Sequence, residues 1–197
     1  MRDYCPHCQY PLRTCVCHAI EIFQAPVQLV ILQHPNETLH AKNTARLIRL
    51  CLPDTLIVAG KTVADFDNIR QLCQSRNAAV IYPAETSFSL EQELEVFKQN
   101  TPDILILLDG SWRQAFGLWH ANPWLQALPQ WRFSEAPDSR YGIRHTKLDF
   151  SLSTLEAAAY VLALGYRVNS DNLLQLQDAM QQHWQGPSEH RRNHCAN

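Results

Sequence analysis

Residues 104–115 read Ile-Leu-Ile-Leu-Leu-Asp-Gly-Ser-Trp-Arg-Gln-Ala, and the expected fold is built outward from them. The five aliphatic residues at the start predict a strand buried on both faces, as in parallel sheets. A helix should follow, with Asp109 or Ser111 capping its first amides. Ligands of open α/β sheets bind beyond the carboxyl ends of the strands, so Asp109, Ser111 and Trp112 are candidate functional residues. A capping Asp and a core Trp would produce the same pattern.

The same alternation of strand and helix recurs on the amino-terminal side of this stretch. Apolar runs predict strands at residues 27–33, 56–60 and 79–83, each followed by apolar residues at helical spacing. A capping box at Ser89 and Gln92 opens an acidic helix at residues 91–98. We therefore expect an α/β fold with a mostly parallel sheet flanked by helices.

The carboxyl-terminal part is predicted to be helical. Ser153-Thr154-Leu155-Glu156 forms a capping box for a helix at residues 155–164 that ends at Gly165. The free amides at such a helix start can also hold an anion. An amphipathic helix at residues 173–184 follows, and the polar tail 186–197 is expected to be disordered.

A cluster of four cysteines stands at the amino terminus, with the spacing of a metal-binding segment. Its members are Cys5, Cys8, Cys15 and Cys17. Two closely spaced thiolate pairs can complete a tetrahedral site, and bound metal would stabilise a segment too poor in apolar residues to fold alone. We expect a structural Zn²⁺ in residues 1–20, with His7 or His18 as a possible replacement for one cysteine. Redox-labile thiols on a flexible arm are the alternative.

The composition bounds the protein class. At 197 residues and 46% hydrophobic, the chain can form one sizeable domain, which we place at residues 21–185. A net charge of −2 argues against a uniformly basic nucleic-acid binder, so any RNA contact must be local. No apolar stretch approaches a membrane span, and the first residues lack a secretory signal. Seven cysteines without export information favour a cytoplasmic protein, and a monomer is our default.

Two segments after the central stretch invite a nucleic-acid interpretation. Trp119, Trp124 and Trp131 could stack bases, but burial in the core is favoured because Trp usually buries most of its area. Residues 132–147 form the most basic window of the chain. Its cations are Arg132, Arg140, Arg144 and Lys147. This window is a candidate phosphate-contact surface, although solvated loop charges would look the same.

Several motifs together resemble a known family. Asp109-x-Ser111-Trp112 resembles the signature of the DTW-domain family, with Ser111 in place of the more usual Thr. Further matching blocks occur in the same order along nearly the whole chain, after the cysteine cluster. These blocks are Gln33-His34-Pro35-x-Glu37, Asn43-Thr44, Tyr141-Gly142-Ile143-Arg144 and Ser153-Thr154-Leu155-Glu156-Ala157. Five blocks in order make the resemblance specific.

The resemblance implies a tRNA-uridine aminocarboxypropyltransferase, related to SPOUT-type methyltransferases, with a trefoil knot formed after Leu108. The donor would be S-adenosylmethionine, the acceptor N3 of a tRNA uridine, and the by-product methylthioadenosine. The short form with the cysteine cluster looks like the bacterial enzyme of the tRNA variable loop. Only the family supports the knot, because knots are very rare among folds.

The resemblance also implies roles for individual residues. Asp109 would accept the N3 proton, while Ser111 and Trp112 would shape the pocket. The donor site would be lined by Leu108, Gly110, Tyr141, Ile143, Arg144, Ser153, Thr154 and Glu156. The RNA substrate would contact His34, Glu37, Asn43, Arg132, Arg140 and Lys147.

Two other functions compete with this one. A SPOUT-like methyltransferase would use the same donor but release S-adenosylhomocysteine. A non-enzymatic zinc-ribbon module would bind RNA but have no pocket for a sulfonium nucleoside.

Overall fold

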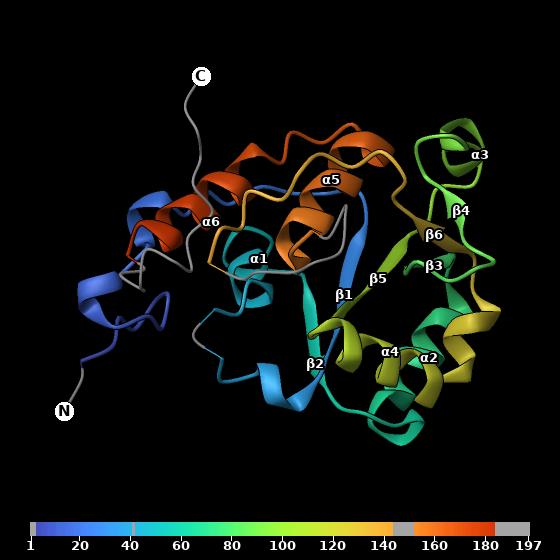
Figure 1. Ribbon diagram of the computed structural model, residues 1–197, viewed down its shortest axis with the longest axis horizontal. Coiled ribbons are helices and arrows are strands. Elements are labelled where there is room, and N and C mark those ends of the chain that lie inside the picture. Colours follow the sequence, from blue (N-terminus) through green and yellow to red (C-terminus); the bar gives the residue numbers. More distant parts are fainter. Residues whose placement is uncertain (1–2, 41, 144–151, 184–197) are drawn as a thin grey trace.

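A six-stranded sheet forms the centre of the molecule, whose computed structural model describes residues 3–40, 42–143 and 152–183. The strand order is β2-β1-β5-β3-β6-β4, and every pairing in this sheet is parallel (Figure 1). The strands are β1 (Gln28–Gln33), β2 (Leu56–Ala59), β3 (Ala78–Ile81), β4 (Phe88–Ser89), β5 (Ile104–Asp109) and β6 (Gln130–Arg132). The predicted parallel α/β architecture is confirmed.

Helices cover both faces of the sheet. They are α1 (Ala45–Cys51), α2 (Asp67–Ser75), α3 (Leu94–Gln99), α4 (Trp112–Ala121), α5 (Thr154–Tyr166) and α6 (Asp171–Gln182). Short 3₁₀ turns lie at η1 (Leu12–Thr14), η2 (Cys17–Ala19), η3 (Pro35–Glu37), η4 (Val63–Phe66) and η5 (Pro123–Ala127). Helices α2 and α4 lie on one face, and α1, α5 and α6 lie on the other (Figure 1).

The strict alternation of side chains along β1 and β5 explains the two layers. Leu29 and Leu105 point into the core beneath α1, α5 and α6, whereas Val30 and Ile106 point into the core beneath α2 and α4. All four are at most 2% exposed. A continuous aliphatic run is therefore required in both strands, because each of their faces is covered by helices.

The amino-terminal segment packs into the same core as the sheet. Tyr10 and Val16 are buried in one apolar cluster with Leu29 of β1 and Leu162 of α5. The guanidinium carbon of Arg46 in α1 lies 3.5 Å from the centre of the Tyr10 ring. Residues 3–20 therefore form a docked element.

Several element ends differ from the prediction. The fifth helix continues to Tyr166 and ends at Arg167, which adopts the left-handed conformation at φ 56°. Gly165 lies inside the helix, and glycine is needed at this position because a Cβ there would approach the Phe97 ring to 2.6 Å. The predicted acidic helix begins later, at Leu94, since Ser89 pairs in β4 and residues 90–93 form a turn. The short strands β4 and β6 were not predicted.

The favoured interpretation of the tryptophans is confirmed for two of them. Trp119 and Trp131 are each 6% exposed and lie in the two apolar clusters, while Trp124 is half-buried. Within the described ranges, every helix is too short or too polar to cross a bilayer. The trefoil knot stays a prediction. Arg144, Lys147 and the tail 186–197 lie outside the described residues.

Candidate functional site at the carboxyl ends of β3, β5 and β6

Helix α4 starts beyond the end of β5, with Ser111 as its cap. The Ser111 hydroxyl accepts a hydrogen bond from the N–H of Gln114, and the Gln114 side chain accepts one from the N–H of Ser111 at 2.6 Å. Gly110 permits this reciprocal cap, because a Cβ at that position would lie 2.8 Å from the Gln114 Cβ. Of the two predicted caps, Ser111 is the one used, and the Asp109 side chain makes other contacts.

Asp109 connects three parts of the chain. One carboxylate oxygen accepts hydrogen bonds from Gln33 Nε2 at 2.9 Å and Asn43 Nδ2 at 3.0 Å. The other accepts one from the Thr154 hydroxyl at 2.5 Å. Asp109 is 3% exposed, so these side chains take the place of water around the carboxylate. The pairing of Gln33 with Asp109 in neighbouring parallel strands brings the first of these donors into reach.

The start of α5 lies against the same strand end. Ser153 caps α5 through the predicted box with Glu156, which is confirmed. The buried Glu156 carboxylate also accepts hydrogen bonds from the Ser139 hydroxyl at 2.8 Å and the Arg140 N–H at 2.6 Å. Glu156 therefore fastens the loop at residues 139–142 to the first turn of α5.

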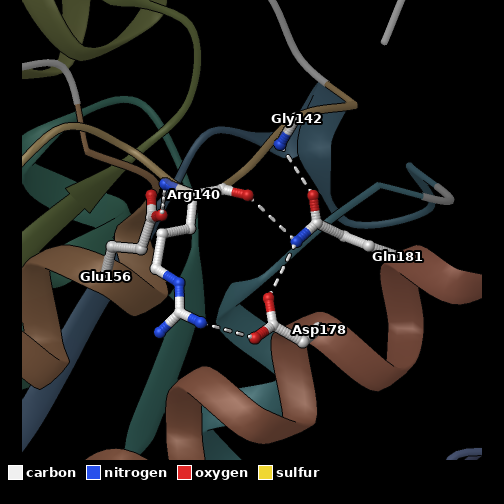
Figure 2. A network of polar contacts seen from close by, with 5 residues as sticks. All are labelled: Arg140, Gly142, Glu156, Asp178 and Gln181. Carbon is white, nitrogen blue, oxygen red and sulfur yellow. Dashed lines mark hydrogen bonds and ion pairs between the residues drawn. The ribbon is translucent and has the colours of Figure 1, made fainter. Parts of the chain in front are cut away.

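Helix α6 holds that loop from its other side (Figure 2). Gln181 accepts a hydrogen bond from the Gly142 N–H at 2.7 Å and donates one to the Arg140 carbonyl at 3.2 Å. The Arg140 guanidinium forms an ion pair with Asp178 at 3.1 Å. The backbone on both sides of Tyr141 is thereby fixed, and the Tyr141 hydroxyl donates to the Lys42 carbonyl.

A cavity of about 280 Å³ lies between these elements. Its walls come from the ends of β3, β5 and β6, the first turns of α4 and α5, and the loop that carries Tyr141. Eight predicted site residues line it: Leu108, Gly110, Ser111, Trp112, Arg132, Tyr141, Ser153 and Thr154. The volume is near the lower end of the range of roughly 300–1,000 Å³ for small-molecule sites.

The other predicted site residues lie around the cavity without lining it. Asp109 and Asn43 stand behind Thr154, and Glu156 lies behind Ser153. The Ile143 carbonyl accepts a hydrogen bond from Lys42 Nζ at 2.6 Å. Arg140 is held by Asp178, and Arg144 and Lys147 lie outside the described residues.

His34 and Glu37 occupy the turn after β1. The His34 N–H donates to the Asp109 carbonyl at 2.8 Å, and the His34 Nδ1 accepts from the Asn36 N–H at 3.2 Å. Burial lowers the pKa of His34, and the charge of Lys61 lowers it further. The lowered pKa favours the neutral ring, and because Nδ1 accepts a hydrogen bond, the neutral ring carries its proton on Nε2. Glu37 is 4% exposed and lies in η3.

The four cysteines lie together at the amino terminus. Their sulfur atoms are all within 4.8 Å of one another, with Cys5 and Cys17 3.5 Å apart and Cys8 and Cys15 3.7 Å apart. A zinc–sulfur distance of about 2.3 Å gives tetrahedron edges of about 3.8 Å, so the set fits such an ion. Among these thiols without a metal, the N–H groups of Cys8 and His7 lower the pKa of Cys5 to about 6, whereas burial and the neighbouring sulfurs raise the pKa of Cys17 to about 12. The assignment of a metal site therefore rests on the sulfur geometry.

Comparison with known proteins identifies the family. The model of the DTW domain matches residues 2–185, which is nearly the entire chain.

The chain belongs to the DTW-domain family.

Two relatives with the same name show what the chain is similar to. The DTW chain is 34% identical over 170 residues to tRNA-uridine aminocarboxypropyltransferase 2 of Drosophila melanogaster, covering 83% of this chain and 66% of the relative. It is 28% identical over 169 residues to the protein of that name in Mus musculus, covering 83% and 56%. The chain thus spans a little over half to about two thirds of these relatives' length. No solved structure matches it.

Several residues of this DTW site were not predicted. Gln33 donates to Asp109, Thr44 and Ser139 line the cavity, and Phe133 and Leu152 complete its wall. Gln33 and Thr44 stood within the matching blocks but had no assigned role. Phe133 and Leu152 carried no signal, because an aromatic or aliphatic residue after a short strand or before a helix cap is common in any α/β protein.

Proposed function

We propose that this protein transfers the 3-amino-3-carboxypropyl group of S-adenosylmethionine to N3 of a tRNA uridine. We also propose that the protein is a monomer and acts in the cytoplasm. The observation that carries the proposal is that residues from three separated DTW motifs line one and the same cavity beyond the strand ends. These are Gly110, Ser111 and Trp112, then Tyr141, then Ser153 and Thr154. The names of the curated relatives describe the same chemistry in longer chains.

The cavity suits a sulfonium nucleoside. Ile81, Leu107 and Ala157 offer an apolar wall for an adenosine, and the rings of Trp112 and Tyr141 offer faces to which a cation is attracted. The first turns of α4 and α5 both open on the cavity. Because helix amino termini attract negative charge, these turns would hold the carboxylate of the donor's methionine part.

The proposed reaction is a single displacement. N3 of the uracil forms a bond to the side-chain carbon attached to the sulfonium, and the bond from that carbon to sulfur breaks. The bonding pair leaves with sulfur as methylthioadenosine, and the N3 proton passes to a base on the protein. A uracil keeps this proton at neutral pH, so its loss must accompany carbon–nitrogen bond formation.

We assign the proton acceptor to the pair Thr154 and Asp109. Thr154 lines the cavity and donates its hydroxyl hydrogen to Asp109 at 2.5 Å. As N3 reacts, its proton would pass to the Thr154 oxygen while the hydroxyl hydrogen passes to Asp109. Ser111 and Trp112 would position the uracil, and an unpaired or flipped uridine is required to reach them. The remaining RNA contacts are assigned to His34, Arg132, Arg140 and Lys147, whereas the buried Glu37 and Asn43 would support the site from behind.

We also propose that the four cysteines hold one structural Zn²⁺. Four thiolates close the coordination shell, so the ion would stabilise residues 1–20 and take no part in the transfer. The proposed division of the chain is this segment at residues 1–20, a catalytic domain at 21–185 and a tail at 186–197. The trefoil knot and a target in the tRNA variable loop belong to the proposal on the strength of the family resemblance.

The experiment is a product analysis with purified protein, tRNA and S-adenosylmethionine. Release of methylthioadenosine with an equal amount of modified uridine in the digested tRNA is the expected result. Release of S-adenosylhomocysteine instead would mean a methyltransferase. Binding of tRNA without either product would mean a non-enzymatic RNA-binding module.

A further inference from the structure

Helix α4 carries a row of aromatic side chains on its solvent side. Trp112, Phe116 and His120 are spaced four residues apart, so they follow one another along the same side of the helix. Trp112 is 40% exposed, Phe116 is 58% exposed, and His120 is exposed. We call these three residues the aromatic row.

The row is open to solvent. The rings of Phe116 and His120 lie 4.2 Å apart between centroids. Gly117, beside them in the chain, has no side chain, and a Cβ there would meet nothing within 4 Å, so the surface at this position is open. Single exposed apolar residues are common on protein surfaces, but neighbouring exposed rings in one row form a contiguous patch of the kind that marks binding surfaces.

The charge on helix α4 itself suits a polyanion. Helix α4 contains Arg113, which is exposed, and no acidic residue. Exposed rings beside a cation are the combination that binds single-stranded nucleic acid, because bases stack on the rings and the cation contacts phosphate. A protein partner would need no such cation beside the rings.

The row is continuous with the cavity. Trp112 lines the cavity and begins the row, which then leads away from the carboxyl ends of the strands. Eight residues of α-helix rise about 12 Å, and stacked nucleotides of one strand rise about 3.4 Å each. The row is therefore long enough for roughly three nucleotides.

We propose that the aromatic row of α4 binds the unpaired nucleotides next to the target uridine, with their bases stacked on Phe116 and His120. This deepens the proposed function, on which it rests, by naming the surface that recognises a single-stranded stretch around the uridine. Neither residue belongs to the motifs that line the cavity.

The test compares Phe116→Leu with Phe116→Tyr. Leu keeps an apolar side chain but cannot stack, whereas Tyr keeps the ring. We expect Phe116→Leu to raise the Kd for tRNA by about 5- to 100-fold, with the Kd for S-adenosylmethionine unchanged, and Phe116→Tyr to stay within about twofold of wild type. Phe88→Leu is the matched control, because Phe88 is also 58% exposed but lies in β4.

A second measurement locates the contact directly. With a 5-iodouridine placed beside the target uridine, illumination should crosslink the RNA to the α4 peptide that contains Phe116. Equal tRNA affinity of wild type and Phe116→Leu, or crosslinks only to other peptides, would overturn the proposal. The proposal would also be overturned if the row bound a protein through apolar contacts and the Phe116→Leu variant bound that protein as tightly as wild type.

The result with the Phe116 variants can be interpreted independently of the product analysis that tests the proposed function. If wild type binds tRNA but forms no methylthioadenosine, the proposed function fails, and the Phe116 variants still decide whether RNA lies on the row. If wild type forms methylthioadenosine and the variants behave alike, the function stands and the row is not its RNA surface.

Discussion

At the scale of single residues, Asp109 organises the site. Its two oxygens accept hydrogen bonds from Gln33 on β1, Asn43 before α1 and Thr154 on α5. Asn43 in turn accepts the N–H of Arg46, which fixes its amide with the nitrogen toward Asp109. Since the carboxylate is buried and contacts the cavity wall through Thr154, its two proposed functions, positioning and proton acceptance, can be separated by substitution.

Replacing Asp109 by Asn should slow turnover and spare donor binding. The Asn oxygen can still accept from Gln33 and Asn43, while the new NH₂ group faces Thr154 and can take no proton. We expect the turnover rate to fall by ~10²–10⁴ with the donor Kd unchanged by calorimetry. A donor Kd that weakens in proportion to the lost rate would instead make Asp109 a contact to the donor's ammonium group.

Replacing Thr154 by Val should have a similar effect, because Val keeps the shape and removes the hydroxyl. Single-turnover rates should fall by ~10²-fold or more in Thr154→Val and return close to wild type in Thr154→Ser. Thr101→Val serves as control, since that hydroxyl only contacts the Lys98 carbonyl. Full activity of Thr154→Val would remove Thr154 from the proton path.

What the sequence predicts at this scale depends on distance along the chain. The caps Ser111 and Ser153 were predicted correctly because capping is a contact over three residues. The Asp109 contacts with Gln33 and Thr154 span 76 and 45 residues and arise only when the strands pair and α5 docks. No local pattern encodes such contacts.

At the scale of elements, helix α6 positions a loop that lines the cavity, although α6 itself contributes no lining residue. Gln181 binds the backbone on both sides of Tyr141, and Tyr141 lines the cavity. Gln181→Leu removes both hydrogen bonds, at a cost of about 2 kcal/mol in total, so the donor Kd should rise by up to roughly 30-fold. Gln182→Leu is the matched control, because Gln182 is the exposed neighbour on the same helix. Equal donor Kd values for the two variants would contradict the positioning role.

The cysteine segment is the second element that can be tested alone. Because Tyr10 and Val16 lie in the core beside α5, loss of a metal should destabilise more than the segment itself. We expect one equivalent of zinc, and a chelator should lower Tm by more than about 5 °C while the sheet stays folded at 25 °C. Cys8→Ser should abolish the chelator's effect, and Cys73→Ser should retain it. Freshly reduced protein without zinc would contradict the assignment.

Elements were predicted where their residues carry a strong local pattern. The aliphatic runs of β1 and β5 are confirmed within a residue. The strands β4 and β6, of two and three residues, exist only through pairing with each other and with β3, so no periodicity could reveal them. Gly165 was taken for a helix end because glycine usually is one, but close packing against Phe97 requires it inside α5.

At the scale of the whole molecule, a protein with a net charge of −2 needs a local surface to hold RNA. The aromatic row and the basic window supply two candidates, on α4 and on the segment after β6. The fold class follows from the alternating elements, whereas the strand order comes only from the structure and the reaction from neither. The proposed activity depends on the DTW motifs, and the cavity gives those motifs a common location.

The central claim is that the donor loses its aminocarboxypropyl group and keeps its methyl group. The decisive measurement uses S-adenosylmethionine labelled either in the methionine carboxyl carbon or in the S-methyl carbon, with purified protein and unmodified tRNA. Label from the carboxyl carbon should enter the tRNA, and label from the methyl carbon should remain in methylthioadenosine. Methyl label in the tRNA, with carboxyl label left in the small-molecule product, would contradict the account.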